Sequence, residues 1–329
     1  MGYKKLGVYT TALWAGLLVY CFHCFAALDH FNLGDKRFAY EMSAPIGKGA
    51  DSSVYVATEV SKGWCNNRLL EGPQKLVIKL ATNQANLARE IEAIEKNIEK
   101  DREFLKYIPH PRGIVRTSLG LAMAMEFIEY ARSLHILLEA GPLPEMQVAQ
   151  VFIPLVRGLG ILHKNGYVHC DVKPKNILVK PLLYRPEVRI IDFGFTRTKA
   201  EIDHHIKNYR IFGTPAYLSP DVFMGDHDER ADLWAVVVSI YQALTKSFVY
   251  LTESGNADMR IEDLNNIHHL FLNGLYSIPI PDYLSPPMKR LLRIGFDPDI
   301  EKRYQSAIGL EDDLREVLRY WSNKKGESR

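Results

Sequence analysis

The sequence has few cysteines and no excess of either charge. Only 4 of its 329 residues are cysteine, which is too few for a disulfide framework in a chain of this length. Cys21 and Cys24 form a C-x-x-C pair, but they lie in an apolar run without a βαβ context, so buried thiols are the favoured interpretation. The net charge is +2, and we therefore expect no nucleic-acid partner. With 47% hydrophobic and 24% charged residues, the chain can form one large domain or two lobes with separate cores.

Fixed charge is missing altogether between Gly7 and Leu28. Such a run is long enough for a helix that crosses a bilayer, which needs about 20 apolar residues. We expect residues 1–28 to form a hydrophobic N-terminal segment, with membrane association through residues 7–28. Two alternatives stay open. The segment can be a signal peptide of a secreted protein, cleaved after Ala26, or a hydrophobic helix that docks on the rest of the protein.

The remaining chain changes from strand patterns to helix patterns. A short polar connector (29–36) is expected first, and a long solvated loop at 59–74. Alternating or clustered β-branched and aromatic residues predict strands, and apolar residues at helical spacing predict helices. The expected strands are 38–45, 53–58, 75–80, 113–119 and 121–128, and the expected helices are 86–107, 144–165, 230–246, 286–295 and 307–321. Strands followed by helices imply an α+β fold with two unequal lobes.

Two short motifs carry the chemistry, VHCDVKPKN at 168–176 and IIDFG at 190–194. Apolar, β-prone residues flank them, so a loop–strand–turn–strand unit would bring four polar side chains toward one point. These side chains are Asp171, Lys173, Asn176 and Asp192. Hard oxygen ligands suit Mg²⁺ and an ammonium offsets phosphate charge, so the group suits a nucleoside triphosphate with its metal.

The order H-C-D-x-K-x-x-N followed by D-F-G resembles the catalytic core of the eukaryotic-type protein kinases. The resemblance implies a kinase domain at 38–325, with a small β-rich N-lobe (38–128) and a larger, mainly helical C-lobe (129–325). It implies ATP and Mg²⁺ as cofactors and a protein as substrate. Asp171 would be the catalytic base, Lys173 would offset charge on the transferred phosphoryl group, and Asn176 and Asp192 would bind the metal. Lys173 and Thr214 are typical of serine/threonine rather than tyrosine kinases.

The same resemblance implies a nucleotide site. Lys79 would bind phosphate and pair with a helix glutamate, for which we choose Glu90 over Glu92, Glu95 and Glu99 because Ile91 and Ile94 follow it on the core side. Met125 would be the gatekeeper, and the backbone of Glu126 and Ile128 would bond the adenine. The residues expected to line the nucleotide are Ile46, Gly47, Gly49, Val54, Val77 and Leu178.

The resemblance also assigns supporting roles. Asp232 would hold the backbone of the catalytic loop, Asp221 would pair with Arg303, and His169 would be a packed core histidine. Asp221 stands where the family usually has glutamate, and the shorter side chain is expected to loosen the pair with Arg303.

The sequence departs from the family pattern beside the catalytic aspartate. Cys170 stands where regulated kinases carry arginine, and residues 199–213 contain no serine or threonine. An arginine there creates a positive charge that a phosphate must satisfy, whereas a thiol does not. We therefore expect a serine/threonine protein kinase that is active without phosphorylation of this segment. The alternative is a pseudokinase-like nucleotide-binding scaffold, although the catalytic residues are present. Transfer to a small molecule is discouraged by the peptide-docking motif GTPAY.

Overall fold

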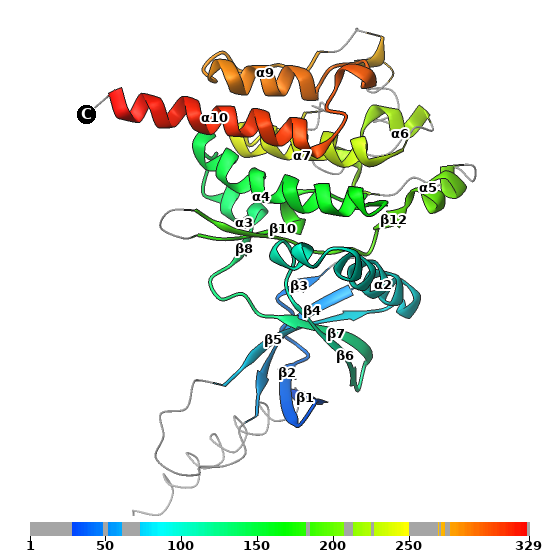
Figure 1. Ribbon diagram of the computed structural model, residues 1–329. Coiled ribbons are helices and arrows are strands. Elements are labelled where there is room, and N and C mark those ends of the chain that lie inside the picture. The colour runs from blue at the N-terminus through cyan, green and yellow to red at the C-terminus, as the bar shows by residue number, and fades with distance from the viewer. Residues whose placement is uncertain are drawn as a thin grey trace, which may run out of the picture. The chain divides into compact units, whose positions relative to one another are not determined.

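The computed structural model describes residues 28–48, 52–60, 73–181, 185–206, 213–224, 227–249, 269, 271–273 and 277–327. The chain forms two compact units (Figure 1). Unit 1 contains the described residues up to Leu87 and His110–Phe127, and unit 2 contains Ala88–Pro109 and the described residues from Ile128 onward. The apolar residues 7–27, Gly49 and most of the loop expected at 59–74 lie outside the described residues, so these expectations stay predictions.

Unit 1 is an antiparallel β-sheet. Its strands follow the order β1-β2-β4-β5-β7-β6, and the short β3 pairs with β4. The strands are β1 (Leu28–Leu33), β2 (Lys36–Glu41), β3 (Gly47–Lys48), β4 (Ser52–Glu59), β5 (Lys75–Ala81), β6 (Pro111–Thr117) and β7 (Gly120–Glu126). The strands expected from residue alternation are confirmed, with small shifts at their ends.

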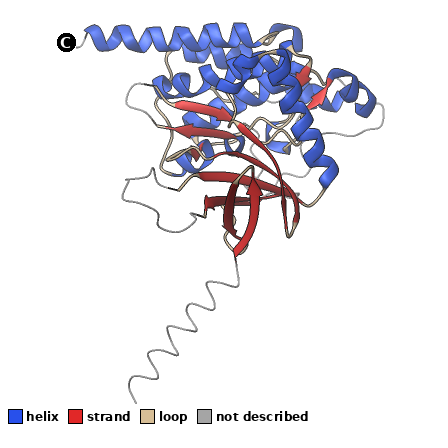
Figure 2. Ribbon diagram, turned by 60° about the horizontal axis from the view of Figure 1, so that its bottom comes forward, coloured by secondary structure: helices blue, strands red, loops and turns tan. Residues whose placement is uncertain are grey.

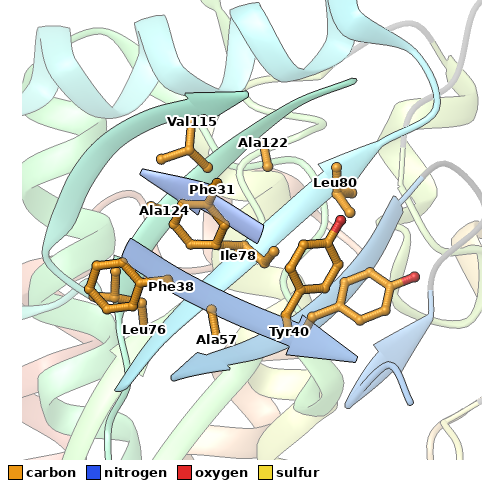
Figure 3. Packing of buried hydrophobic residues seen from close by; sticks show 11 residues of the cluster. Phe31, Phe38, Tyr40, Ala57, Leu76, Ile78, Leu80, Val115, Ala122 and Ala124 are labelled. Atoms are coloured by element: carbon orange, nitrogen blue, oxygen red, sulfur yellow. The ribbon is translucent and has the colours of Figure 1, made fainter. Parts of the chain in front are cut away.

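The core of unit 1 is a cluster of buried side chains against this sheet, and several of them are aromatic (Figure 3). Phe31 stacks on Phe38 with ring centroids 5.5 Å apart, and Tyr40 contacts Tyr55 at 5.1 Å. Small and branched side chains of the other strands complete the cluster, namely Ala57, Leu76, Ile78, Leu80, Val115, Ala122 and Ala124. Offset and tilted aromatic pairs of this kind add to the stability that area burial supplies.

The expectation of a polar connector at residues 29–36 is wrong, because most of this stretch is strand β1 and its turn into β2. The turn uses Gly34, whose φ of +60° is a conformation that favours glycine. Asp29 fixes the other end of β1. Its carboxylate accepts hydrogen bonds from the Tyr40 hydroxyl (2.8 Å) and from the backbone N–H (2.9 Å) and hydroxyl (2.8 Å) of Ser118, in the turn between β6 and β7. The first strand is therefore tied to the far end of the sheet.

Unit 2 is mainly helical (Figure 2). Its helices are α3 (Leu134–Glu139), α4 (Glu145–Lys164), α5 (Lys199–Ile206), α6 (Pro220–Met224), α7 (Glu229–Thr245), α9 (Pro286–Gly295) and α10 (Ala307–Glu327), and most of α2 (Gln84–Lys100) also belongs to it. The sheet of unit 1 and the helices of unit 2 confirm the expected α+β class. The helix expected at 86–107 ends earlier, at Lys100, because the Asp101 side chain caps a separate 3₁₀ turn, η1 (Arg102–Lys106), by accepting from Glu103 N–H.

The core of unit 2 is built around α7 and α4. Trp234, Val237 and Ile240 of α7 are almost fully buried, as the apolar middle of this helix predicts. At the N-terminal end of α4, the Glu145 carboxylate accepts hydrogen bonds from Ser285 N–H (2.8 Å) and Trp321 Nε1 (3.0 Å). This buried carboxylate therefore connects α4 with the start of α9 and with α10, and its hydrogen bonds offset the cost of its burial.

Short strands and turns in unit 2 hold the catalytic segments. The ladder β11-β10-β8 joins β8 (Arg132–Ser133), β10 (Ile177–Lys180) and β11 (Glu187–Ile190), and β9 (Tyr167–Val168) pairs with β12 (Arg197–Thr198). Three further 3₁₀ turns are η2 (Pro174–Asn176), η3 (Pro215–Tyr217) and η4 (Ile300–Lys302). The antiparallel pairing of β10 with β11 confirms the two strands expected between the two motifs, while residues 182–184 of their connection lie outside the described residues.

Candidate active site

Asp171 is the centre of a hydrogen-bonded network in unit 2. Its side chain is 2% exposed and accepts from three neighbours. Oδ2 accepts from Lys173 Nζ at 2.7 Å and from Asn176 Nδ2 at 3.0 Å, and Oδ1 accepts from the Thr214 hydroxyl at 2.6 Å. Lys173 Nζ also donates to the Thr214 hydroxyl oxygen at 2.6 Å. One charged group and two polar groups therefore fix the carboxylate in one orientation.

Local backbone structure explains why these residues meet. Lys173 is extended and the next three residues form η2, which begins with Pro174, whose fixed φ suits the first position of a turn. Asn176 ends this turn, so its side chain reaches back and donates to the Asp171 carbonyl oxygen at 2.9 Å. Both observed side-chain hydrogen bonds of Asn176 use its Nδ2 atom. Its amide oxygen is therefore the atom that can serve as a ligand.

Asp232 of α7 supports the catalytic loop from within the core. Its carboxylate accepts from the backbone N–H groups of His169 (2.8 Å) and Cys170 (2.9 Å) and lies 2.8 Å from His163 Nε2. Burial alone would raise the pKa of Asp232, but the bond and charge of His163 and the contacts with His169 outweigh it and hold the pKa below its ordinary value of 3.8. The expected role of Asp232 is confirmed, and His163 is a partner that the sequence motifs did not reveal.

His169 is fully buried and packs against Phe193, with ring centroids 5.2 Å apart. Its Nδ1 accepts from the Asp171 backbone N–H at 3.2 Å. Within the described residues its Nε2 has no hydrogen-bond partner. Burial and ring packing agree with the expectation of a core histidine.

Asp192 and Phe193 follow β11 and come next to Asn176. The Ile191 N–H donates to the Asn176 carbonyl oxygen at 3.0 Å, and β10 pairs with β11 from Ile177 and Ile190. Asn176 and Asp192 are thus at the same end of one antiparallel hairpin. Asp192 has a φ of +68°, an uncommon conformation for a residue with a side chain, and such backbone outliers cluster at functional sites.

Of the four candidate glutamates of α2, Glu90 is buried (3% exposed), whereas Glu92, Glu95 and Glu99 are exposed. Glu90 Oε1 accepts from the Phe193 backbone N–H at 3.1 Å, which connects α2 with the D-F-G turn. This favours the choice of Glu90, while its pairing with Lys79 of unit 1 stays a prediction.

Unit 1 contains most of the residues expected to bind nucleotide. Lys79 is buried (6% exposed) in β5, where its register partners are Val54 of β4 and Met123 of β7. A buried strand lysine needs anionic partners to offset its desolvation. Gly47 pairs with Val54, Ile46 donates its N–H to the Val54 carbonyl at 2.8 Å, and Val77 pairs with Met125.

The residues expected to contact the adenine fall in both units. Met125 and Glu126 are the last two residues of β7 in unit 1. The Glu126 N–H donates a hydrogen bond to the His110 carbonyl oxygen at 2.9 Å. Ile128 is buried and begins the second continuous stretch of unit 2, where Leu178 lies in β10 opposite Ser133. The structure therefore locates each of these residues within one unit, and the binding of adenine by them stays a prediction.

The segment 213–221 is anchored to the core of unit 2. Asp221 forms a buried ion pair with Arg303, and Arg303 Nη1 also donates to Ser219 Oγ at 3.1 Å. The Arg303 guanidinium lies 4.6 Å from the Trp234 ring centroid. The expected pair is confirmed, but the expected loosening is not seen, because the direct contact is made despite the shorter side chain.

These features are those of a protein kinase fold with a complete catalytic loop. The chain matches the protein kinase domain family over residues 40–314, and it therefore belongs to that family. Family membership implies the use of ATP and a divalent metal.

The chain is similar to several serine/threonine-protein kinases. Kinase CLA4 of Saccharomyces cerevisiae is 26% identical over 286 residues, which cover 82% of this chain and 32% of the yeast protein. Kinase pkn2 of Myxococcus xanthus is 27% identical over 296 residues, covering 85% and 32% respectively. Kinase PknL of Mycobacterium tuberculosis is 40% identical over 196 residues, covering 59% and 46%. The chain thus spans less than half the length of these three relatives.

Proposed function

We propose that the chain transfers the γ-phosphoryl group of ATP to serine or threonine hydroxyls of a protein substrate. The observation that carries this proposal is the network of Asp171, Lys173 and Thr214. The 2.6 Å bond from the Thr214 hydroxyl to Asp171 Oδ1 shows that this oxygen accepts a hydrogen bond from an alcohol. A substrate hydroxyl that donates to the same carboxylate would be oriented for attack on the phosphoryl group.

Lys173 has a second task in this proposal. Phosphoryl transfer needs positioning and charge compensation more than strong basicity. Lys173 Nζ donates to Asp171 and Thr214 together, so its charge is held beside the carboxylate that would orient the hydroxyl. The ammonium can therefore offset negative charge on the transferred group.

The residues present fit Mg²⁺ as the metal. Asn176 and Asp192 offer an amide and a carboxylate oxygen from one end of the β10–β11 hairpin. Within the described residues no cluster of three or more His, Cys, Asp or Glu side chains is placed to hold an ion. Mg²⁺ typically uses one or two protein oxygens together with substrate phosphates, and when bound it would neutralise phosphate charge. Lys79 would contact the phosphates, with Glu90 as its partner.

Residue-specific phosphotransfer tests this function. The full chain is incubated with ATP, Mg²⁺ and a generic protein substrate, and phosphosites are identified by mass spectrometry. We expect phosphoserine and phosphothreonine with the unaltered chain, and their loss in Asp171→Ala and Lys79→Ala. Asp312→Asn, which removes an exposed carboxylate, is the control that stays active. Equal low incorporation in all forms would instead support the nucleotide-binding scaffold.

We further propose that activity does not need phosphorylation of the segment 192–221, which we call the activation segment. The support is the surroundings of Cys170. Its side chain is 8% exposed and clusters with Val168 and Ile202. Burial, together with the nearby charge of Asp232, raises the pKa of the Cys170 thiol well above its ordinary value of 9.0, so the group is neutral at physiological pH. A neutral thiol creates no demand for a phosphate.

The membrane association through residues 7–28 is also a proposal, and its support is the uncharged sequence run. Among the described helices, α4 alone is long and apolar enough to cross a membrane, and more than half of that stretch is buried inside the protein. Fractionation and sequencing of the mature N-terminus test the proposal. Recovery in the membrane fraction with residues 7–28 intact is expected, whereas a mature N-terminus near Ala27 would identify a cleaved signal peptide.

A further inference from the structure

After the D-F-G turn and β12, the activation segment forms a short helix, α5, with a capped first turn. After the β9–β12 pair, in which Arg197 lies opposite Val168, the chain enters α5. Thr198 and Glu201 bond reciprocally at its first turn, because the Glu201 carboxylate accepts from Thr198 N–H (2.8 Å) and the Thr198 hydroxyl accepts from Glu201 N–H (3.3 Å). These bonds fix the direction in which α5 leaves the strand.

The direction of α5 brings Ile202 onto the catalytic loop. Ile202 is 1% exposed and forms an apolar cluster with Val168 and Cys170. Cys170 is the residue directly before Asp171, and its thiol donates to the Val168 carbonyl oxygen at 3.5 Å. A charged side chain at position 170 could not take part in this cluster without a large desolvation cost.

The far end of the segment meets the backbone of the same cysteine. Gly213 has a φ of +108°, and a Cβ atom there would lie 2.5 Å from the Cys170 carbonyl oxygen. The backbone therefore approaches Cys170 more closely than any residue with a side chain would allow. The next residue, Thr214, bonds to Asp171 and Lys173. Cys170 thus contacts the activation segment near residue 202 with its side chain and at residue 213 with its backbone.

We propose that Ile202 is a positioning residue for phosphoryl transfer, which acts by packing on Cys170 and so holds the activation segment on the catalytic loop in place of a phosphate. This inference rests on the proposed kinase activity without segment phosphorylation. Loss of the contact frees the segment at α5, so that Thr214 is less well held beside Asp171. The effect falls on the rate of transfer and on peptide binding, because Thr214 is bonded to the carboxylate that would orient the substrate hydroxyl.

The sharpest test keeps the shape of the side chain and changes its polarity. Valine and threonine have similar shapes. The Ile202→Val and Ile202→Thr side chains differ only in that threonine has a hydroxyl group where valine has a methyl group. The full-length proteins are prepared with phosphatase treatment. For each, kcat, the KM values for peptide and for ATP, and the melting temperature are measured. Ile308→Val and Ile308→Thr form the matched control pair, because Ile308 is 73% exposed on α10.

We expect kcat of Ile202→Thr to be about tenfold below that of Ile202→Val, with the KM for ATP the same in both, since small displacements of positioning groups cost one to two orders of magnitude in rate. The Ile308 pair should not differ. In a double-variant cycle, Cys170→Ala should lower kcat in the unaltered background and have about half that effect or less in Ile202→Thr, because contacting residues are coupled.

The outcomes are separable. Equal kcat for folded Ile202→Val and Ile202→Thr, or strictly additive effects in the cycle, would overturn the positioning role of Ile202. If Ile202→Thr does not fold, Ile202→Ala, which also removes the packing on Cys170, takes its place in the cycle and is judged by the same criterion. An inactive, unphosphorylated but folded unaltered chain would overturn the proposed activity without segment phosphorylation, on which this inference rests.

Discussion

Thr214 donates its hydroxyl hydrogen to Asp171 Oδ1 at 2.6 Å, across 43 residues of sequence. Asp171 belongs to the catalytic loop, and Thr214 belongs to the activation segment. The bond therefore reports whether that segment is in a conformation that completes the site, and it gives Thr214 a role beyond that of a marker for serine/threonine specificity.

The first prediction concerns this bond. Thr214→Val keeps the shape of the side chain but removes the hydroxyl that Asp171 and Lys173 share, so kcat should fall by about 10²-fold, the scale set by a lost orienting contact. Thr214→Ser keeps the hydroxyl and should retain most of the rate. Steady-state kinetics with a peptide substrate check both values. Equal rates for the two variants would remove Thr214 from the network.

The second prediction concerns Asp232. Asp232→Asn removes the negative charge that faces His163 and the backbone N–H groups of the catalytic loop. We expect this change to lower the free energy of unfolding by about 3 kcal/mol at pH 7. The pKa of Asp232 is depressed in the folded protein. Its charge therefore stabilises the fold above the unfolded pKa near 3.8, and this contribution is lost as the pH falls through the folded pKa.

Urea unfolding of the unaltered and Asp232→Asn proteins between pH 7 and pH 3 measures this difference. The gap between the two should shrink below pH 3.8. Asp312→Asn, an exposed control, should stay within about 0.5 kcal/mol of the unaltered chain. A gap that stays constant over the whole pH range would show that the charge of Asp232 does not contribute.

The third prediction concerns strand β1. Phe31 is buried against Phe38, so Phe31→Ala should destabilise unit 1 by about 3 kcal/mol, the usual cost of truncating a core aromatic residue. Leu28→Ala, at a 41% exposed position of the same strand, should have little effect. Amide hydrogen exchange in β2 and β4 provides the measurement. A chain that begins at residue 35, after β1, and protects these amides as well as one that begins at residue 28 would contradict the role of β1.

The fourth prediction concerns Cys170. Cys170→Arg would bury a guanidinium close to Arg197, whose pKa is already lowered by its burial and by the charge of Arg89. We expect the unphosphorylated variant to lose about 90% of its activity, since like charges and desolvation act together. Cys170→Ser keeps a small, uncharged and unbranched side chain at this φ of +65° and should stay active. Activity assays on phosphatase-treated protein check this pair, and full activity of Cys170→Arg would refute the argument.

Local patterns predicted most of the regular structure because it depends on neighbours in the sequence. The helix at Pro286–Gly295 has the predicted bounds, since Ser285 caps it and prolines begin it. Strand β1 was not predicted. The stretch is short and polar, and Asp29 is fixed by Ser118, a partner 89 residues away that leaves no periodic signal in the sequence.

The candidate site likewise contains residues that the sequence predicted and contacts that it did not. Motif spacing predicted Asp171, Lys173 and Asn176, which the structure brings together in one network. It could not reveal that His163 lies beside Asp232, or that Ile202 packs on Cys170, because both contacts depend on how α4 and α5 are placed. The binding roles of Lys79, Glu90 and the residues expected to contact the adenine stay predictions.

The most direct test of the central claim is transfer of ³²P from [γ-³²P]ATP to a protein substrate by the full chain, expressed in bacteria and treated with phosphatase. The account predicts steady incorporation by the unaltered protein from the first time point, and none above background for Asp171→Asn, whose fold is checked by its melting temperature. Incorporation that is equal in the two proteins, or that begins only after a separate kinase has phosphorylated the activation segment, would contradict it.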